Sequence, residues 1–539
     1  MTTTETNNKS QVATQSGDMV EVFDTTLRDG MQVEGVSATV EDKLRIAEQL
    51  DFLGVHYIEG GWPGANPKDE EFFARAASEL TLSTSTLVAF GSTRRPRGKV
   101  DDDATLRNLL AANTSAVCIV AKSWDYHVTS ALQTTLEEGV AMVGDSVRFL
   151  HGNGRQVLVD LEHFFDGYKR NPEFALQVAE AAVMNGATHL VMCDTNGGSL
   201  PHEVHDIVTA VRAHVGSDAV LGIHCHDDTG CAVANSMAAV RAGARHVQGT
   251  LNGLGERTGN TNLTTVIPNL ELKMGHTCLP TGNLSRLTSV SNHVAEVLNR
   301  PLNPQAPYVG TSAFAHKAGL HVSAIARAKD AYEHVDPEVV GNGTRFVVSE
   351  MAGRATIQMK ADELGLPMDG PAVNQVIDDL KRLEHEGYHF EAADASLELL
   401  MRRAAGWTQD FFRVESMRVI TDETTSGSFT TEATVKVWVG DRRFVHVSEG
   451  NGPVNAIDTA LRAALLGRFP RLARVHLTDY KVRILDGATA TGAVTRVLID
   501  ATNGDRTWTT IGVSPNIIEA SWRALEESLV YGLLHDTEL

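Results

Sequence analysis

Two histidines separated by one residue, His224 and His226, are the most chemically informative feature of this chain. They lie in the segment LGIHCHDDTG, residues 221–230. If the segment is a strand, side chains two residues apart point to the same side. Two imidazoles beside the carboxylates of Asp227 and Asp228 suit a divalent metal that takes nitrogen and oxygen ligands. For this segment alone, a polar strand end whose histidines hydrogen-bond to neighbours is the alternative.

Two distant segments favour the metal site. TLRDG at 26–30 places Arg28 beside an acid at the end of an apolar run, and GERTGN occupies 255–260. The metal set predicted from the three segments is Asp29, His224, His226 and Asn260. Mixed ligands with open positions are typical of a Lewis-acid site that an α-keto acid could chelate. Arg28 could stabilise oxygen charge as it develops, or be a structural partner of an acid such as Glu59.

The elements that must position these residues form a repeating pattern. Eight short apolar runs, each followed by a segment with helical periodicity, lie at 20–26, 57–61, 86–92, 116–123, 156–164, 189–196, 219–227 and 246–255. This alternation predicts an α/β fold, a (β/α)8 TIM barrel over residues 19–279. A doubly wound parallel sheet is the alternative, but eight similar consecutive units favour closure.

Polar residues recur at the ends of these runs, where a barrel builds its active site. Besides the metal set, Glu162 falls late in the fifth run and Thr195 falls late in the sixth. Glu162 is a candidate acid or substrate-orienting group, and Thr195 is a candidate hydroxyl donor to a carboxylate. We therefore expect residues far apart in the sequence to converge on one rim of the barrel.

The rest of the chain divides by pattern. Residues 1–18 are polar and predict a disordered tail, and residues 280–404 predict helical linker subdomains. From 405 to 539, alternating strands and two helices predict an α+β domain with glycine-rich loops at 449–456 and 485–494. These loops either bind a small ligand or are only turns. In the linker, His321 and Tyr332 are either acid–base groups that reach over the rim or ordinary helix residues.

Composition excludes several classes of protein. A formal net charge of −21 argues against binding to nucleic acid, and the basic run RRPRGK at 94–99 is expected to be a solvated loop or an anion-binding lip. No apolar stretch approaches the length of a membrane span. The 5 cysteines include no C-x-x-C pair, which favours a reducing compartment, and we expect the cytoplasm.

The motifs resemble those of the α-isopropylmalate and homocitrate synthase family. TLRDGMQ at 26–32, followed by Lys43, resembles one family signature, and the segment 224–260 resembles the other. Within the family, the segments 59–73, 121–128 and 160–172 resemble the branch that uses pyruvate. The resemblance extends from the barrel through the linker to a C-terminal domain like the family's regulatory dimer domain.

This resemblance implies a function. The family condenses acetyl-CoA with a 2-keto acid in a Claisen-type reaction that needs a divalent metal (Mn²⁺, Mg²⁺ or Zn²⁺), and then hydrolyses the thioester. Carried over by motif, Arg28 would polarise the keto acid, Glu162 and Thr195 would orient substrate, and His321 and Tyr332 would act in water activation or proton transfer. We expect pyruvate as the acceptor, a place in isoleucine synthesis, a homodimer and feedback by isoleucine.

Three alternatives remain at this point. One is a 2-isopropylmalate synthase that uses 2-oxoisovalerate for leucine synthesis. The second is a lyase that runs the same bond chemistry in reverse. The third is a non-catalytic amino-acid sensor that keeps the barrel as a scaffold.

Overall fold

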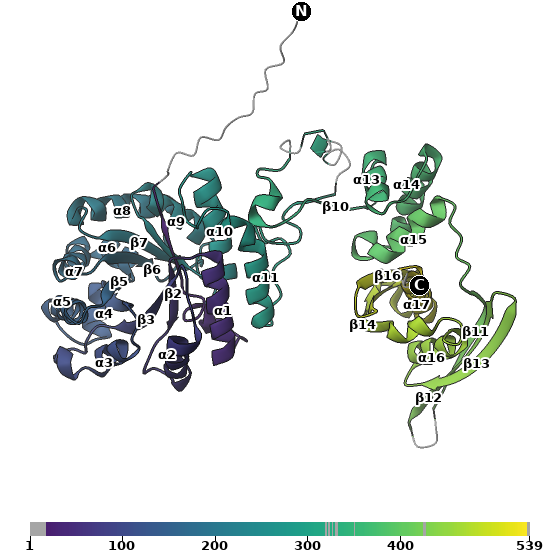
Figure 1. Cartoon of the computed structure of the whole chain (residues 1–539), viewed down its shortest axis with the longest axis horizontal. Helices are drawn as coiled ribbons and strands as arrows, with labels where there is room; N and C mark the ends of the chain where they lie inside the picture. The colour runs from purple at the N-terminus through teal and green to yellow at the C-terminus, as the bar shows by residue number, and fades with distance from the viewer. Residues whose placement is uncertain are drawn as a thin grey trace, which may run out of the picture. The chain divides into compact units, whose positions relative to one another are not determined.

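The structure, a computed structural model, describes residues 18–317, 321, 324–325, 327–328, 332–349, 351–423 and 427–535. The chain divides into two compact units (Figure 1). The first takes in Met1–Phe314 and Val335–Gly343, and the second takes in Ala315–His334 and Thr344–Leu539. Except for Asp18, the predicted disordered tail lies outside the described residues.

The first unit is a closed barrel of parallel strands in sequence order, which confirms the predicted (β/α)8 fold. The strands are β1 Glu21–Asp24, β2 Tyr57–Gly61, β3 Thr86–Ser92, β4 Ala116–Lys122, β5 Gln156–Glu162, β6 His189–Asp194, β7 Val220–Cys225 and β8 His246–Gly249. The barrel closes where β1 pairs with β8, with Glu21 opposite His246. Because helices cover the outside and side chains fill the inside, these strands read as almost continuous apolar runs.

Helices of the first unit surround the strands (Figure 1). They are α1 Val40–Leu53, α2 Pro67–Glu79, α3 Ala104–Ala111, α4 Asp125–Ser130, α5 Leu136–Gly152, α6 Phe164–Arg170, α7 Pro172–Met184, α8 Pro201–Val215, α9 Ala232–Arg241, α10 Leu263–Pro268 and α11 Leu287–Val297. Helix α1 shows why the chain turns where it does. Thr39 and Asp42 form a capping box at its start, and Gly54 ends it in the left-handed conformation (φ 96°).

The basic run at 94–99 is not wholly a solvated loop, so that expectation is wrong for Arg94. Its side chain is only 6% exposed and pairs with Glu138 at 2.7 Å and with Asp145 at 2.8 Å, both on α5. This arginine therefore fastens the loop to the barrel wall.

In the second unit, the linker region is helical as predicted. Two-residue strands, β9 Ala315–His316 and β10 Arg345–Phe346, pair in parallel and are followed by α13 Arg354–Glu363, α14 Gly370–His385 and α15 Asp394–Ala404. The first unit continues past residue 279 through α11 to Phe314. The domain boundaries predicted at 279 and 404 stay predictions.

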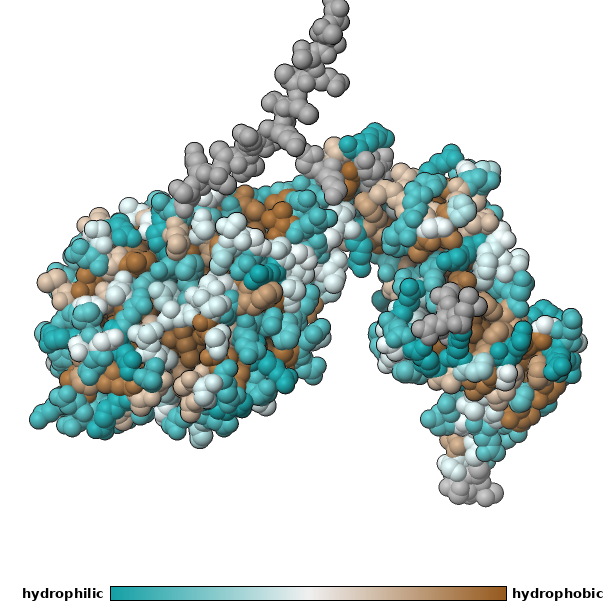
Figure 2. All heavy atoms as spheres, viewed as in Figure 1, coloured by the Kyte–Doolittle hydropathy of each residue, from teal (hydrophilic) through white to brown (hydrophobic). Residues whose placement is uncertain are grey.

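The C-terminal part contains the same arrangement twice, three antiparallel strands followed by a helix. The first copy is β11 Arg413–Glu423, β12 Phe429–Val439, β13 Arg442–Gly450 and α16 Pro453–Leu465; the second is β14 His476–Ile484, β15 Thr495–Thr502, β16 Thr507–Ser514 and α17 Ile517–His535. Each helix packs on one face of its sheet, and the two helices share one hydrophobic core. Figure 2 shows hydrophobic atoms exposed over the β11–β13 sheet, where Val445 is 48% and Val447 54% exposed.

The structure describes the surroundings of the cysteines. Cys118, Cys193, Cys225 and Cys278 are buried and none is in a disulfide. Among the described residues, no helix combines the length and the apolarity that crossing a membrane would need.

Candidate metal centre and active site

Three of the four predicted metal ligands come together at the carboxyl end of the barrel strands. His224 lies near the end of β7, His226 follows that strand, and Asp29 lies in the loop after β1. The Nε2 atoms of the two imidazoles face each other at 3.4 Å, and Asp29 Oδ2 lies 3.7 Å from His224 Nε2. All three side chains are buried, and their ligand atoms lie within 4.8 Å of one another.

Asn260, the fourth predicted ligand, is held against this cluster by the loop after β8. It forms an isolated antiparallel bridge with His226. Its Nδ2 donates to Asp29 Oδ1 at 3.2 Å and to the carbonyl of Leu254 at 3.1 Å. The residues predicted from three separate segments therefore surround one point.

The hydrogen bonding of this cluster fits a divalent cation. Asn260 Oδ1 and His226 Nδ1 are buried and have no hydrogen-bond partner among the described residues. Leaving such atoms unsatisfied is costly in a protein interior. A carboxylate, two imidazoles and an amide oxygen form a suitable donor set for Mn²⁺, Mg²⁺ or Zn²⁺.

The electrostatics keep these ligands in metal-binding forms. Burial lowers the pKa of His226 to about 4, so this imidazole is neutral at pH 7. Burial alone would raise the pKa of Asp29, but Arg28 and the two histidines hold it at about 2. Metal ligands must be deprotonated, and both groups meet that condition at neutral pH.

A buried amide on β8 orients His224. Gln248 is fully buried, and its Oε1 accepts a hydrogen bond from His224 Nδ1 at 2.9 Å. Its Nε2 donates to Asp160 Oδ1 at 3.0 Å, which fixes the amide orientation. The proton of His224 is thus held on Nδ1, and the lone pair of Nε2 points toward Asp29 and His226.

Arg28 is both a structural partner and a group that faces the site. Its Nε donates to the fully buried Glu59, and its Nη1 lies 3.3 Å from Asp29 Oδ2. The guanidinium also stacks on the ring of Phe90, 3.8 Å from the ring centre. Burial raises the pKa of Glu59, while Arg28 opposes the rise. These contacts hold a cation in a fixed orientation beside the predicted metal ligands.

Glu162 and Thr195 lie at the carboxyl ends of neighbouring strands. Glu162, the last residue of β5, pairs with Lys122, the last residue of β4. Thr195 follows β6, and its Oγ1 accepts a hydrogen bond from the backbone of His163 at 2.9 Å. That contact leaves the Thr195 hydroxyl proton for another acceptor.

His321 and Tyr332 belong to the second unit, not to the barrel unit. Their rings stack with centres 4.2 Å apart. Their predicted action at the barrel rim stays a prediction.

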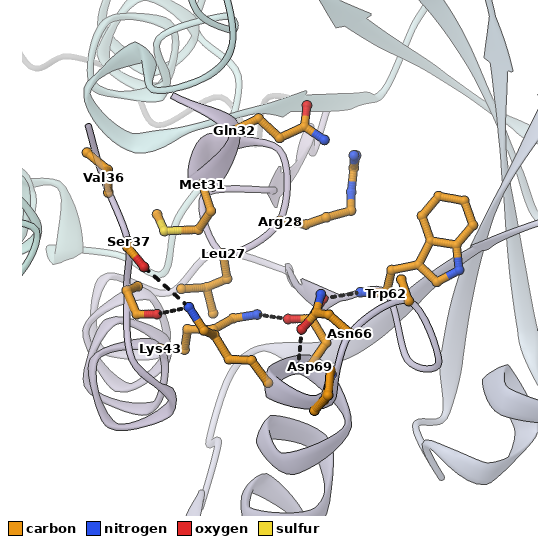
Figure 3. Close-up of a pocket in the computed structure, with 14 residues that line it drawn as sticks. Leu27, Arg28, Met31, Gln32, Val36, Ser37, Lys43, Trp62, Asn66 and Asp69 are labelled. Carbon is orange, nitrogen blue, oxygen red and sulfur yellow. Dashed lines mark hydrogen bonds and ion pairs between the residues drawn. The ribbon is translucent and has the colours of Figure 1, made fainter. Parts of the chain in front are cut away.

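A cavity of about 620 Å³ borders Arg28 between the loops after β1 and β2 (Figure 3). Leu27, Met31, Val36 and Trp62 give it apolar walls. At its edge, the buried Lys43 of α1 contacts Asp69 of α2 at 2.6 Å, which joins the first two helices. The site therefore has room for a ligand next to the Arg28 guanidinium.

Sequence reasoning missed several residues that build the site. Gln248, Asp160 and Phe90 all lie in apolar strand runs, where a single polar or aromatic residue has no motif to mark it. The only sequence signal for them was a polar or bulky residue at a strand position whose side chain points into the barrel. The pairing of Arg28 with Glu59, in contrast, was among the stated alternatives and is confirmed.

Comparisons with known proteins cover nearly all of the chain. The HMGL-like family matches residues 19–294, the homocitrate synthase post-HMGL domain-like family matches 308–388, and the LeuA allosteric (dimerisation) domain matches 391–533. An (R)-citramalate synthase of Aquifex aeolicus is 52% identical over 96% of this chain and 98% of its own length. An (R)-citramalate synthase of Streptomyces coelicolor is 54% identical over 96% of this chain and 97% of its own length. A 2-isopropylmalate synthase of Acetivibrio thermocellus is 29% identical over 93% of this chain and 95% of its own length.

Proposed function

The chain belongs to the (R)-citramalate synthase family, and we propose that it catalyses the reaction for which that family is named. It is an acyltransferase that condenses acetyl-CoA with pyruvate to give (R)-citramalate and CoA. The observation that carries the assignment is the intact barrel site in a chain about half identical to several such enzymes along almost its full length. The 2-isopropylmalate synthase alternative is less supported, at 29% identity.

Asp29, His224, His226 and Asn260 would hold the divalent metal. When bound, this ion supplies Lewis-acid polarisation of the keto group. Gln248 presents the His224 lone pair to it, and Arg28 lies 3.3 Å from the Asp29 carboxylate. Arg28 is therefore placed to bind a keto-acid oxygen and to stabilise negative charge on it as the new carbon–carbon bond forms.

We assign to Glu162 the removal of the α-proton from the acetyl group of acetyl-CoA. Its carboxyl group pairs with the Lys122 side chain at the end of the neighbouring strand, so it stands at the rim of the barrel. An ionised carboxylate can accept the α-proton of acetyl-CoA, and the resulting enolate attacks the keto carbon of pyruvate. Thr195 would donate its hydroxyl proton to a substrate carboxylate.

Hydrolysis of the thioester requires an activated water. We assign this step to His321 and Tyr332, whose stacked rings offer one nitrogen base and one phenol close together. Tyr332 is 44% exposed, which leaves it accessible to a substrate or another surface.

Preference for pyruvate is assigned to an aromatic wall beside Arg28. Phe90 stacks under the guanidinium, and Trp62 packs edge-on against Phe90 with ring centres 5.3 Å apart. Large rings in fixed contact leave room for the methyl group of pyruvate more readily than for the branched side chain of 2-oxoisovalerate. The cavity of about 620 Å³ next to Arg28 would take the pantetheine arm of acetyl-CoA.

The C-terminal part is assigned to regulation and dimerisation. Residues Asn451–Asn455 line a cavity of about 550 Å³ together with Val475, Leu477 and Tyr480. Its mixed apolar and polar lining suits a small aliphatic amino acid, and we assign isoleucine as the feedback effector. The product would then serve isoleucine synthesis in the cytoplasm, in keeping with five cysteines that include no C-x-x-C pair.

The test of this function is the identity of the product and of the preferred acceptor. Purified protein with Mn²⁺ should release CoA from acetyl-CoA when pyruvate is present, and chiral chromatography should identify (R)-citramalate. kcat/KM should be higher for pyruvate than for 2-oxoisovalerate or 2-oxoglutarate. A higher kcat/KM with 2-oxoisovalerate would assign the chain to the sister synthase, and no release with any acceptor would favour the lyase or sensor alternatives.

The effector site has its own test. Isoleucine should lower the rate of wild-type protein, and Val454→Trp, which fills the cavity, should abolish inhibition while leaving the uninhibited rate unchanged. Leu200→Trp on the barrel surface is the control. Inhibition that persists in Val454→Trp would exclude this cavity as the effector site.

A further inference from the structure

A second cluster of metal-ligating side chains lies at the opposite end of the barrel from the active site. Glu21, His189 and His246 are the first residues of β1, β6 and β8, so in a parallel barrel they share the amino-terminal end, here called the base. Their ligand atoms lie within 4.8 Å of one another. The proposed function uses none of them.

Two imidazoles converge on one carboxylate oxygen. Glu21 Oε2 lies 2.7 Å from His189 Nε2 and 3.3 Å from His246 Nδ1. The His189 and His246 side chains are 4% and 0% exposed, whereas that of Glu21 is 25% exposed. The two histidine rings lie 4.9 Å apart, and Phe23 and Tyr57 pack against the ring of His246. The cluster is thus enclosed by aromatic rings and reachable from solvent along Glu21.

The hydrogen bonds around His189 leave a lone pair facing a carboxylate. Thr188 donates its hydroxyl proton to the carbonyl of Val157 at 3.1 Å, and the same oxygen lies 2.8 Å from His189 Nδ1. With the single hydroxyl proton on the carbonyl of Val157, Nδ1 is the donor in the second contact. His189 Nε2 then faces Glu21 Oε2 with its lone pair, and a positive charge is needed between them, either a second proton or a metal ion.

His246 points to the same conclusion independently. Its ring is fully buried, and its Nδ1 lies 3.3 Å from Glu21 Oε2. A buried imidazole whose Nδ1 faces the same carboxylate oxygen as a second imidazole is an arrangement typical of a metal site.

We propose that Glu21, His189 and His246 bind a Zn²⁺ ion at the base of the barrel. Two histidines and one carboxylate form a zinc donor set, and the partly exposed side of Glu21 leaves a position for a water ligand. Thr188 is the outer partner that fixes the tautomer of His189, as metal-binding histidines require. The ion would join β6 to β1 and β8, the strands that close the barrel, and so has a structural role distinct from that of the active-site metal.

Metal counting on the full-length protein tests the proposal. Protein stripped with a chelator, loaded with Zn²⁺ and desalted should retain two equivalents per chain by mass spectrometry. His189→Gln and Glu21→Gln should each retain one equivalent and keep pyruvate-dependent CoA release with Mn²⁺. Asp29→Asn should also retain one equivalent of Zn²⁺, but it should lose CoA release. The two metal sites are thus counted separately, so a negative result for the base site leaves the proposed active site untouched.

Circular dichroism and thermal unfolding distinguish a lost metal site from a misfolded variant. Circular dichroism should show the helix content of wild type for each variant, and Zn²⁺ should raise the Tm of Asp29→Asn but not that of the double variant Asp29→Asn/His189→Gln. One equivalent in wild type, or two equivalents retained by a folded His189→Gln, would overturn the proposal.

Discussion

At the scale of single residues, one buried amide explains how the site keeps an imidazole ready for a metal. Gln248 accepts from His224 on one side and donates to Asp160 on the other, and all three side chains are buried. The amide cannot rotate without breaking one of these bonds. It therefore imposes on His224 the tautomer that leaves Nε2 free to bind.

Replacing this amide should weaken metal binding. Gln248→Leu has a similar volume but no hydrogen bonds, so we expect the Kd for Mn²⁺ to rise about 10- to 100-fold, the range typical of outer-shell partners. Isothermal titration calorimetry on the metal-free protein measures this, with the exposed Gln358→Leu as control. An unchanged Kd in a folded Gln248→Leu protein would show that His224 is oriented by other contacts.

The aromatic wall gives a prediction about substrate choice. Trp62→Ala removes the ring that packs on Phe90, so we expect kcat/KM for 2-oxoisovalerate to rise relative to pyruvate by at least about tenfold. The acceptors differ by two carbons, and a single methylene in a pocket already discriminates by about that factor. Initial rates of CoA release with each acceptor provide the ratio. Trp124→Ala, at another loop of the same rim, is the control, and equal ratios in both variants would contradict the assignment.

The sequence predicted the ligands of this site better than their surroundings. His224 and His226 could be found because alternation along one strand puts them on one side, and Asp29 because it follows an apolar run. Gln248, Asp160 and Phe90 could not, because their roles come from contacts between strands that are far apart in the sequence. Arg94 was misjudged for the same reason, since its two acidic partners lie on α5, more than 40 residues away.

At the scale of elements, a buried carboxylate fastens the last helix to the linker. Glu398 of α15 contacts Arg402 at 2.6 Å, His535 at 2.8 Å and the hydroxyl of Tyr531 at 3.1 Å, the latter two on α17. Burial alone would raise the pKa of Glu398, but the hydrogen bonds from His535 and Arg402 lower it to about 2.

This contact should make part of the stability pH-dependent. Because the folded pKa lies below the unfolded one, Glu398 contributes stability above about pH 4.5, and this contribution is lost as the pH falls toward 2. We expect Glu398→Gln to cost about 2 to 3 kcal/mol at pH 7, and the difference from wild type to shrink at pH 3.

Urea unfolding of the full chain, followed through the transition of the second unit, measures the difference. Glu519 of α17 pairs with Arg523, and both side chains are exposed. Glu519→Gln should therefore lower the free energy of unfolding by less than about 0.5 kcal/mol at either pH. An equal cost for Glu398→Gln at pH 7 and pH 3 would show that the loss comes from packing and not from charge.

Regular elements were the easiest part to predict. The barrel strands follow hydrophobic periodicity and lie at the expected segments, and the strands and two helices expected between 405 and 539 are present. Where one unit ends and the next begins depends on contacts between segments such as 335–343 and the barrel, which periodicity does not report.

At the scale of the whole molecule, the two C-terminal sheets keep one face exposed. Val445 and Val447 on β13, with Val482 and Ile484 on β14, are between 43% and 60% exposed. A row of exposed apolar side chains on a sheet is typical of an interaction surface. The occupant we propose is a second copy of the chain, in agreement with the match of residues 391–533 to a dimerisation domain.

Light scattering after size exclusion should therefore give twice the 58.2 kDa mass of the chain. Val447→Glu places a charge on the exposed face, at little cost to folding, and should shift the protein toward monomer at micromolar concentration. Leu200→Glu, on a barrel residue that is 43% exposed, should leave the mass unchanged. A wild-type monomer, or a dimer insensitive to Val447→Glu, would contradict this surface.

The central claim is that a metal held by Asp29, His224, His226 and Asn260 serves the condensation of pyruvate with acetyl-CoA. The most direct measurement is CoA release in wild type and Asp29→Asn, each stripped of metal and then supplied with Mn²⁺. We predict pyruvate-dependent release in wild type that disappears on stripping, returns with Mn²⁺, and is at least about a hundredfold weaker in Asp29→Asn. Release that survives stripping, or that Asp29→Asn retains in full, would contradict the account.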